Sequence, residues 1–271
     1  ICPGFVDMHT HSDLTLLANP RGESMIHQGV TTLVVGNCGM GVAPVRPEMR
    51  EPLREAFAFL AAEAEWTWES FGSYLDRLEA ARPSVNVGAL VSHGAARAHV
   101  LGFAEHTASP EEREVIAGVV RQAMAEGALG VSTGLIYNPS MFADTEELVA
   151  VARAAGEGGG VYTTHMRNEV EKLMPALEET LEVARRSGAR VEICHLKASG
   201  KRMWGRAAEA AALVAETRAA GADVSFDLYP YTASSTMLAT LLPQWALIGT
   251  ADEMAARLRD PAAAARALRQ L

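Results

Sequence analysis

The chain has 271 residues, of which 49% are hydrophobic and 21% charged, and its formal net charge is −9. This composition is typical of a globular protein with a sizeable core, and the acidic excess argues against nucleic acid or an anionic membrane surface as a partner. The sequence has no run of about 18 apolar residues, so we expect no transmembrane helix.

Three cysteines, Cys2, Cys38 and Cys194, cannot all pair with one another within the chain. Such usage favours a reducing compartment, in which a cysteine serves as a metal ligand or a nucleophile. We therefore expect a cytoplasmic protein. The chain begins abruptly, close to its first predicted strand, so a leader segment could precede it.

Short apolar or β-branched runs predict seven strands, at 5–8, 31–35, 85–91, 129–132, 161–164, 191–194 and 223–228. Helical spacing lies between or after them, at 19–29, 110–126, 145–155, 171–187, 207–220 and from 253 onward. Ser109 is a plausible N-cap. Strand and helix in alternation predict a parallel α/β sheet, and the length suits one barrel domain.

Seven strand–helix units are one short of a closed barrel. We therefore expect residues 1–271 to form a partial, TIM-like (β/α)8 barrel whose last strand lies beyond the chain. The spacing of apolar residues in 44–83 predicts a helical insertion beside the barrel. We expect the aromatic side chains of this insertion to pack in the core or as a lid; these are Trp66, Trp68, Phe71 and Tyr74.

Residues that bind metals follow several predicted strands, namely His9 and His11, Cys38, His165 and His195. Residues two apart on a strand share a face, so His9 and His11 would project together. Imidazole and thiolate both suit zinc, and the long gaps between these residues exclude a zinc finger. Each residue alone could be core filler or a hydrogen-bonded loop residue. Five of them on one rim predict a catalytic metal site.

Three further residues near this rim are less informative. His93 ends the third predicted strand, where it could contact a substrate or make a loop hydrogen bond. Cys194 precedes His195, so strand alternation predicts that its thiol points to the opposite face as inert core. Asp227 ends the seventh predicted strand.

These residues stand in stretches that resemble the N-acyl-D-amino-acid deacylase (D-aminoacylase) family of the amidohydrolase superfamily. The matching stretches are 4–11, 28–32, 36–39, 127–137, 142–148, 164–169, 195–197 and 227–233. The Asn37-Cys38-Gly39 loop discriminates best, because related amidohydrolases usually bridge their metals with a carboxylated lysine or a glutamate. The His-x-His pair would fit any member of the superfamily.

The resemblance implies roles for eight residues. The ligands of one tightly held zinc would be Cys38, His165 and His195. A second, weaker metal position would use His9 and His11, with Cys38 as a possible bridge. The residues expected to hold a substrate carboxylate are Lys197, Tyr229 and Ser235, since a cation and hydroxyl donors suit that group.

Two features of the family are not found in this sequence. The aspartate that acts as general base is expected beyond residue 271, and the small β-sandwich that flanks the barrel is absent. Asp227 is interpreted as structural rather than as a substitute base, because the family has an aspartate at both places. We expect the chain to be part of a longer enzyme and to have doubtful activity alone.

The function implied is zinc-dependent hydrolysis of the amide bond of a small-molecule N-acyl-D-amino acid to a carboxylate and a free D-amino acid. A cyclic amidase of the hydantoinase or dihydroorotase kind is one alternative. A lysine ending the fourth strand would favour it, but residues 131–134 contain none. A non-catalytic, metal-binding fragment is the other alternative. The oligomeric state is left open.

Overall fold

A computed structural model of the protein describes residues 1–60 and 64–270. Within these ranges, eight short strands form a three-stranded and a five-stranded sheet. The strands are β1 (Phe5–Asp7), β2 (Val30–Val35), β3 (Asn86–Ala89), β4 (Val91–Ser92), β5 (Gly130–Gly134), β6 (Val161–His165), β7 (Arg190–Ile193) and β8 (Val224–Phe226). Every pair is parallel, which confirms the predicted α/β class.

The two sheets meet in the third predicted strand, which is present as β3 and β4. The sheet orders are β1-β2-β3 and β4-β5-β6-β7-β8. At the junction, the Leu90 N–H donates to the Val35 carbonyl at 2.9 Å, and the Ala89 carbonyl accepts from the Leu129 N–H at 2.9 Å. Each half of the predicted strand therefore pairs with a different neighbour.

The last and first strands approach each other without pairing. Within the described residues no ladder joins β8 to β1. Asp227, just after β8, instead accepts a hydrogen bond from the His9 ring, just after β1, at 2.9 Å. Side chains therefore link the two edges at the carboxyl ends of their strands, where barrels place their active sites.

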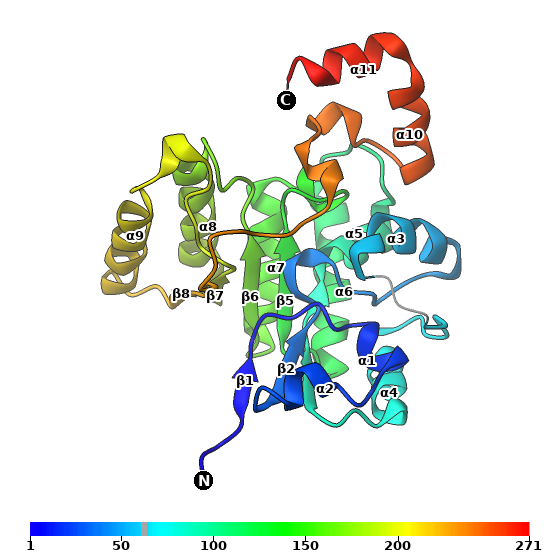
Figure 1. Ribbon diagram of the computed structural model, residues 1–271, viewed down its shortest axis with the longest axis vertical. Helices are drawn as coiled ribbons and strands as arrows, with labels where there is room; N and C mark the ends of the chain where they lie inside the picture. The colour runs from blue at the N-terminus through cyan, green and yellow to red at the C-terminus, as the bar shows by residue number, and fades with distance from the viewer. Residues whose placement is uncertain (61–63, 271) are drawn as a thin grey trace.

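Helices cover the outside of the strands in chain order. They are α5 (His93–Leu101), α6 (Pro110–Ala125), α7 (Thr145–Glu157), α8 (Leu173–Ser187) and α9 (Ala207–Ala219), and each packs against the next (Figure 1). The predicted N-cap is confirmed, because the Ser109 hydroxyl accepts from the Glu112 N–H in a capping box. The helix predicted from residue 171 begins at Leu173. The Asn168 side chain accepts from the N–H groups of Val170 and Lys172 and holds a turn there.

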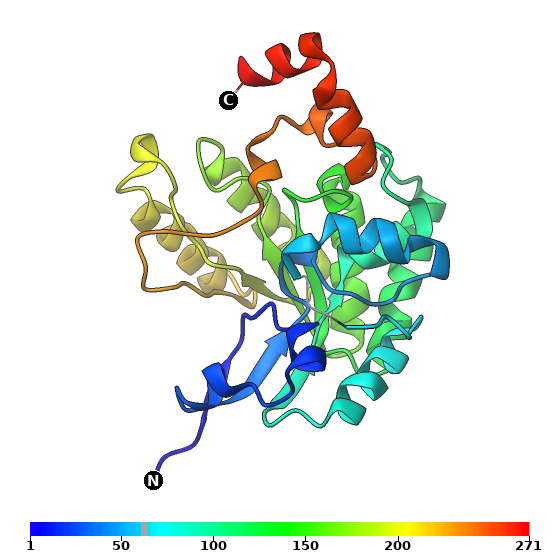
Figure 2. The same cartoon turned by 45° about the vertical axis from the view of Figure 1, so that its right-hand side comes forward.

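The helix predicted at the end of the chain is two helices, α10 (Ala251–Arg259) and α11 (Pro261–Leu268). Pro261 starts the second, and the Asp260 side chain caps it. The chain turns there because proline suits the first helical position and not the interior. Both helices stand at the opposite end of the molecule from the N-terminus (Figures 1 and 2).

The remaining helices lie in the first third of the chain. Near the N-terminus lie α1 (Thr15–Ala18), which the sequence pattern did not predict, and α2 (Glu23–Ile26), which occupies part of the predicted range 19–29. The predicted insertion 44–83 contains α3 (Arg50–Ala56) and α4 (Phe71–Ala81), and its residues 61–63 lie outside the described residues. Single 3-10 turns occupy Asn37–Gly39, Pro47–Met49, Ala58–Leu60, Ser140–Phe142, Lys201–Met203, Leu238–Leu241 and Gln244–Ala246.

The aromatic residues of the insertion are packed, as predicted. Trp66, Trp68, Phe71 and Tyr74 are all buried, and the two indole rings stack with centroids 5.4 Å apart. The Trp68 indole N–H donates to the Val42 carbonyl at 2.8 Å, so the polar end of this ring is also satisfied. None of the described helices is both long and apolar enough to cross a membrane.

Candidate metal centre

Backbone contacts fix the loop that carries Cys38. Gly36 has φ +81°, and a Cβ on it would overlap the Leu90 carbonyl oxygen. A Cβ on Gly134, at the end of β5, would overlap the Cys38 carbonyl oxygen. Cys38 itself has φ +54°, a left-handed conformation that is uncommon for a residue with a side chain. The loop is thus wedged between two strands, with its thiol held in one place.

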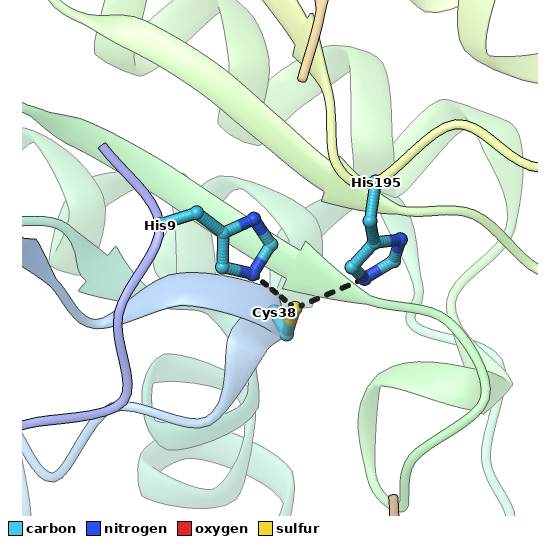
Figure 3. Close-up of side chains that lie close together, drawn as sticks. All are labelled: His9, Cys38 and His195. Atoms are coloured by element: carbon cyan, nitrogen blue, oxygen red, sulfur yellow. Dashed lines mark hydrogen bonds between the residues drawn. The ribbon is translucent and has the colours of Figure 1, made fainter. Parts of the chain in front are cut away.

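Two imidazole rings converge on the Cys38 thiol (Figure 3). His9 Nε2 lies 3.2 Å from Cys38 Sγ, and His195 Nε2 lies 3.6 Å from the same sulfur. The ligand atoms of these three residues all lie within 4.8 Å of one another. Two nitrogens and one sulfur at this separation match a zinc donor set.

The far nitrogen of each ring faces a carboxylate. His9 Nδ1 lies 2.9 Å from Asp227 Oδ2, and His195 Nδ1 lies 2.8 Å from Glu169 Oε1 and 2.9 Å from the Lys197 ammonium. Asp227 also accepts from the backbone N–H of His195, which supports its interpretation as a positioning residue. A carboxylate behind a histidine is the usual way of fixing the tautomer and orientation of a metal ligand. Both Nε2 atoms are thereby aimed at Cys38.

His165 belongs to a second group with Glu169 and His195, whose ligand atoms also lie within 4.8 Å of one another. Its ring centroid is 4.4 Å from that of His195. The Nδ1 atom of His165 is buried without a hydrogen-bond partner. An unsatisfied buried nitrogen is costly, so this atom is an expected position for a ligand bond.

Burial sets the charge of two of these rings. Burial, together with nearby histidines, lowers the pKa of His165 to about 3, although Glu169 opposes the shift, and lowers that of His11 to about 4. Both rings are therefore neutral at pH 7, which is the form that binds metals.

His9 and Glu169 are charged in spite of burial. Burial alone would lower the pKa of His9, but the hydrogen bond to Asp227, with Cys194 beside it, raises the pKa to about 10. Burial alone would raise the pKa of Glu169, but His195, His165 and Lys197 bring the pKa down to about 2. A metal ion that binds His9 must therefore displace a proton.

One cavity joins the predicted site residues. Seven of the eight line it, and the eighth, His9, contacts Cys38 behind the wall. The seven are His11, Cys38, His165, His195, Lys197, Tyr229 and Ser235. The Lys197 ammonium lies 2.5 Å from Glu169 Oε2, donates to the His195 carbonyl at 3.0 Å, and lies 5.7 Å from the Tyr229 ring centroid.

Sequence reasoning gave Glu169 no role, although the structure places its carboxylate between His165, His195 and Lys197. The available signal was its spacing, four residues after His165 at a strand end. Glu169 lies in a loop, however, where the regular spacing of a helix or strand does not determine which way a side chain points.

The prediction that Cys194 faces away from the site is wrong. The ligand atoms of Cys194, His9 and Asp227 lie within 4.8 Å of one another. Strand alternation assumes an extended backbone, but β7 ends at Ile193 and His195 has φ +39°. The chain bends at His195, so Cys194 and His195 both reach the centre.

His93 does not line the cavity described above. Its Nδ1 lies 2.9 Å from Ser140 Oγ and its Nε2 lies 2.8 Å from Glu147 Oε1, and the residue is fully buried. Of the two roles left open for His93, the structure supports the hydrogen bond and not the substrate contact.

Comparisons with known proteins agree with this arrangement. A family model described as "Amidohydrolase family" matches residues 1–269. The D-aminoacylase of Alcaligenes xylosoxydans xylosoxydans is 41% identical over 239 residues, which are 88% of this chain and 48% of that protein. The N-acyl-D-glutamate deacylase of the same organism is 37% identical over 238 residues, again 88% of this chain and 48% of that protein.

Among solved structures, that of an N-acyl-D-glutamate deacylase from Bordetella bronchiseptica, complexed with zinc and a phosphonate inhibitor, superposes with a TM-score of 0.82. It is 35% identical, and the match covers 87% of this chain and 49% of that one. The chain therefore spans about half the length of the relatives that it matches.

Proposed function

The chain belongs to the amidohydrolase family, and from this premise we propose that it acts in the zinc-dependent hydrolysis of N-acyl-D-amino acids. The products are a carboxylate and a free D-amino acid. One observation carries the proposal: two imidazoles converge on a buried thiol, and each is backed by a carboxylate. The names of the two similar deacylases support the substrate class.

The proposed ligands of a tightly held zinc are Cys38, His165 and His195, and those of a weaker position are His9 and His11, with Cys38 as bridge. The donor set supports zinc, because it combines thiolate with imidazole and offers an unsatisfied nitrogen on His165. The zinc-complexed deacylase similar to this chain supports the same metal. Zinc held there would supply Lewis-acid activation of the amide carbonyl and of water.

Lys197, Tyr229 and Ser235 are the proposed clamp for the substrate carboxylate. All three line the cavity. The Lys197 ammonium has three N–H donors, and it lies within hydrogen-bond distance of Glu169 Oε2, the His195 carbonyl oxygen and His195 Nδ1. A substrate oxygen would take the place of one of these partners, and the hydroxyl groups of the other two residues would add donors. This clamp would set the orientation of the substrate and hence the preference for the D-enantiomer.

In this proposal Asp227 positions His9 and the His195 backbone and is not the proton acceptor. An aspartate beyond residue 271 as the general base stays a prediction.

A neighbouring cavity bears on the substrate side chain. It shares Ile136 and Tyr137 with the site and is otherwise lined largely by apolar residues, among them Phe103, Met237, Leu247 and Met254. An apolar lining stabilises an apolar group by removing it from water. We therefore propose a neutral, apolar acyl-D-amino acid rather than an acidic one. A cytoplasmic location is also proposed, because all three cysteines are free.

The test is amine release from N-acetyl-D-leucine by the zinc-loaded protein, expressed with whatever further sequence its gene encodes. N-acetyl-L-leucine tests enantiomer choice, N-acetyl-D-glutamate tests the apolar cavity, and a hydantoin tests the cyclic-amidase alternative. We expect D-selective hydrolysis of the leucine substrate that disappears in Cys38→Ala. The Cys2→Ser variant, which changes an exposed thiol, is the matched control and should keep full activity.

Two outcomes would contradict the proposal. Hydantoin opening without cleavage of any acyl-amino acid would make the protein a cyclic amidase and the clamp assignment wrong. Zinc binding without turnover of any of these substrates would favour the non-catalytic alternative.

A further inference from the structure

Cys194 forms a ligand group that the proposed roles do not use. Its Sγ lies with ligand atoms of His9 and Asp227 in a cluster in which all separations are within 4.8 Å. The residue is fully buried and its thiol is free. His9 belongs both to this group and to the one built on Cys38, so two thiols flank one imidazole.

Polar groups lie beside this thiol, namely the His9 ring, the Asp227 carboxylate and the Cys38 thiol. A cysteine that only fills a core needs no such groups around its sulfur. The bend at His195, with its φ of +39°, is what turns Cys194 toward these groups.

The charge of the group suits a divalent cation. Asp227 contributes a carboxylate whose Oδ1 accepts from the His195 N–H, while Oδ2 lies 2.9 Å from His9 Nδ1. Once an ion has displaced the thiol proton of Cys194 and a proton of the His9 ring, the three residues would offer it two negative charges and one neutral imidazole. This set matches thiophilic divalent ions such as Zn²⁺ and Cd²⁺, and a hard ion such as Mg²⁺ would prefer oxygen ligands alone.

We propose that Cys194, with His9 and Asp227, forms a further metal position that binds thiophilic divalent cations next to the Cys38 centre. The inference rests on the metal centre of the proposed function and adds a second thiolate to it. The thiol proton of Cys194 and one proton of the His9 ring are released to solvent when these residues bind the ion. Because His9 is common to both groups, an ion at Cys194 competes for the imidazole that faces Cys38.

The experiment is a titration of the metal-free protein with Cd²⁺ alone, followed by the near-ultraviolet charge-transfer absorption of cadmium–thiolate bonds. We compare the wild type with Cys194→Ser, Cys38→Ser and Cys2→Ser. Because each bound thiolate contributes to the band, the saturating absorbance should fall to about half in Cys194→Ser and in Cys38→Ser. The exposed Cys2 is the control, and its variant should match the wild type.

The outcomes separate the inference from the proposed function. An unchanged band in Cys194→Ser, together with a lost band in Cys38→Ser, would overturn the Cys194 position and leave the Cys38 centre standing. A band that neither variant reduces would overturn both.

A second measurement avoids any variant that fails to fold. Cadmium-113 to proton correlation spectra of the wild-type protein at saturation should connect cadmium to the β-protons of two different cysteines. Coupling to the β-protons of one cysteine only would overturn the inference.

Discussion

Two buried polar clusters lie at the carboxyl ends of strands, and they differ in how many histidine ring nitrogens remain available to bind a metal. In the metal centre, His9 and His195 each spend one nitrogen on a carboxylate and turn the other toward Cys38. In the second cluster, which we call the closed network, His93 spends both nitrogens, on Ser140 and Glu147. The closed network also contains Arg97, whose guanidinium lies 2.6 Å from Glu147 Oε1.

The difference separates a ligand site from a structural one. Glu147 on α7 holds His93 and Arg97 on α5, so the closed network ties two helices together with the strand end between them. No ring nitrogen of His93 is left for a metal. A histidine at a strand end is thus informative only when its second nitrogen is accounted for.

The largest effect on stability is expected when the closed network loses the negative charge of Glu147. Glu147→Gln leaves the buried Arg97 without a counter-ion, so the free energy of unfolding should fall by about 3–5 kcal/mol. Urea unfolding measures this loss. The adjacent Glu146→Gln is the control, since Glu146 is exposed in a surface pair with Arg186 and its loss should change stability little. Equal stabilities for the two variants would contradict the structural role.

Replacing one histidine in the closed network should change stability but not zinc affinity, and replacing one in the metal centre should do the reverse. His93→Ala should lower the free energy of unfolding by about 2–3 kcal/mol, because it strands buried partners, and should leave zinc affinity unchanged. His165→Ala should lower zinc affinity roughly 100-fold at little cost in stability, because its Nδ1 has no partner to lose. Zinc competition against a chromophoric chelator, with urea unfolding beside it, checks both. Loss of zinc affinity in His93→Ala would remove the distinction.

The carboxylates behind the ligands should have an intermediate effect. Asp227→Asn keeps the shape of the side chain but weakens its hold on His9. The zinc affinity of the weaker position, which includes His9, should fall about 10- to 100-fold, as is usual when such a carboxylate is changed. Isothermal titration with zinc measures the change. An affinity equal to that of the wild type would show that Asp227 does not position His9.

The smallest change in zinc affinity is expected for a change of one pH unit. The pKa of His9 is about 10 in the metal-free protein, so a proton competes with the metal throughout the neutral range. Raising the pH removes the competitor, and the zinc affinity of the weaker position, which includes His9, should rise about tenfold per pH unit between pH 6 and 9. Chelator competition at a series of pH values gives the slope. An affinity independent of pH in this range would mean that His9 is not a ligand.

The spacing of apolar residues, together with capping residues and helix breakers, predicted most of the helices and strands. Strands such as Val161–His165 and helices such as Pro110–Ala125 are signalled by β-branched runs, apolar spacing and a capping serine. The division of the third strand at Leu90 was not predictable, because it depends on which neighbour each half pairs with. The division of the C-terminal helix was signalled by Asp260-Pro261, an N-cap followed by a proline, although a single helix was predicted there.

The site was predictable where residues sit at strand ends, because parallel strands bring their carboxyl ends to one rim. His9, Cys38, His165 and His195 follow that rule. Cys194 does not, because the left-handed backbone at His195 cancels the alternation on which its prediction relied. Glu169 reaches the centre from a loop, and its direction is set only by the folded neighbours.

The wedged Cys38 loop has a consequence for anyone who wishes to transplant this centre into another scaffold. Copying the histidines, the thiol and the carboxylates would not be enough, since the position of the sulfur is dictated by main-chain atoms that touch at Gly36 and Gly134. A host with any side chain at either place would push the thiol out of register with the two imidazoles. The portable unit is therefore a stretch of interlocked backbone, and the donor atoms come along with it.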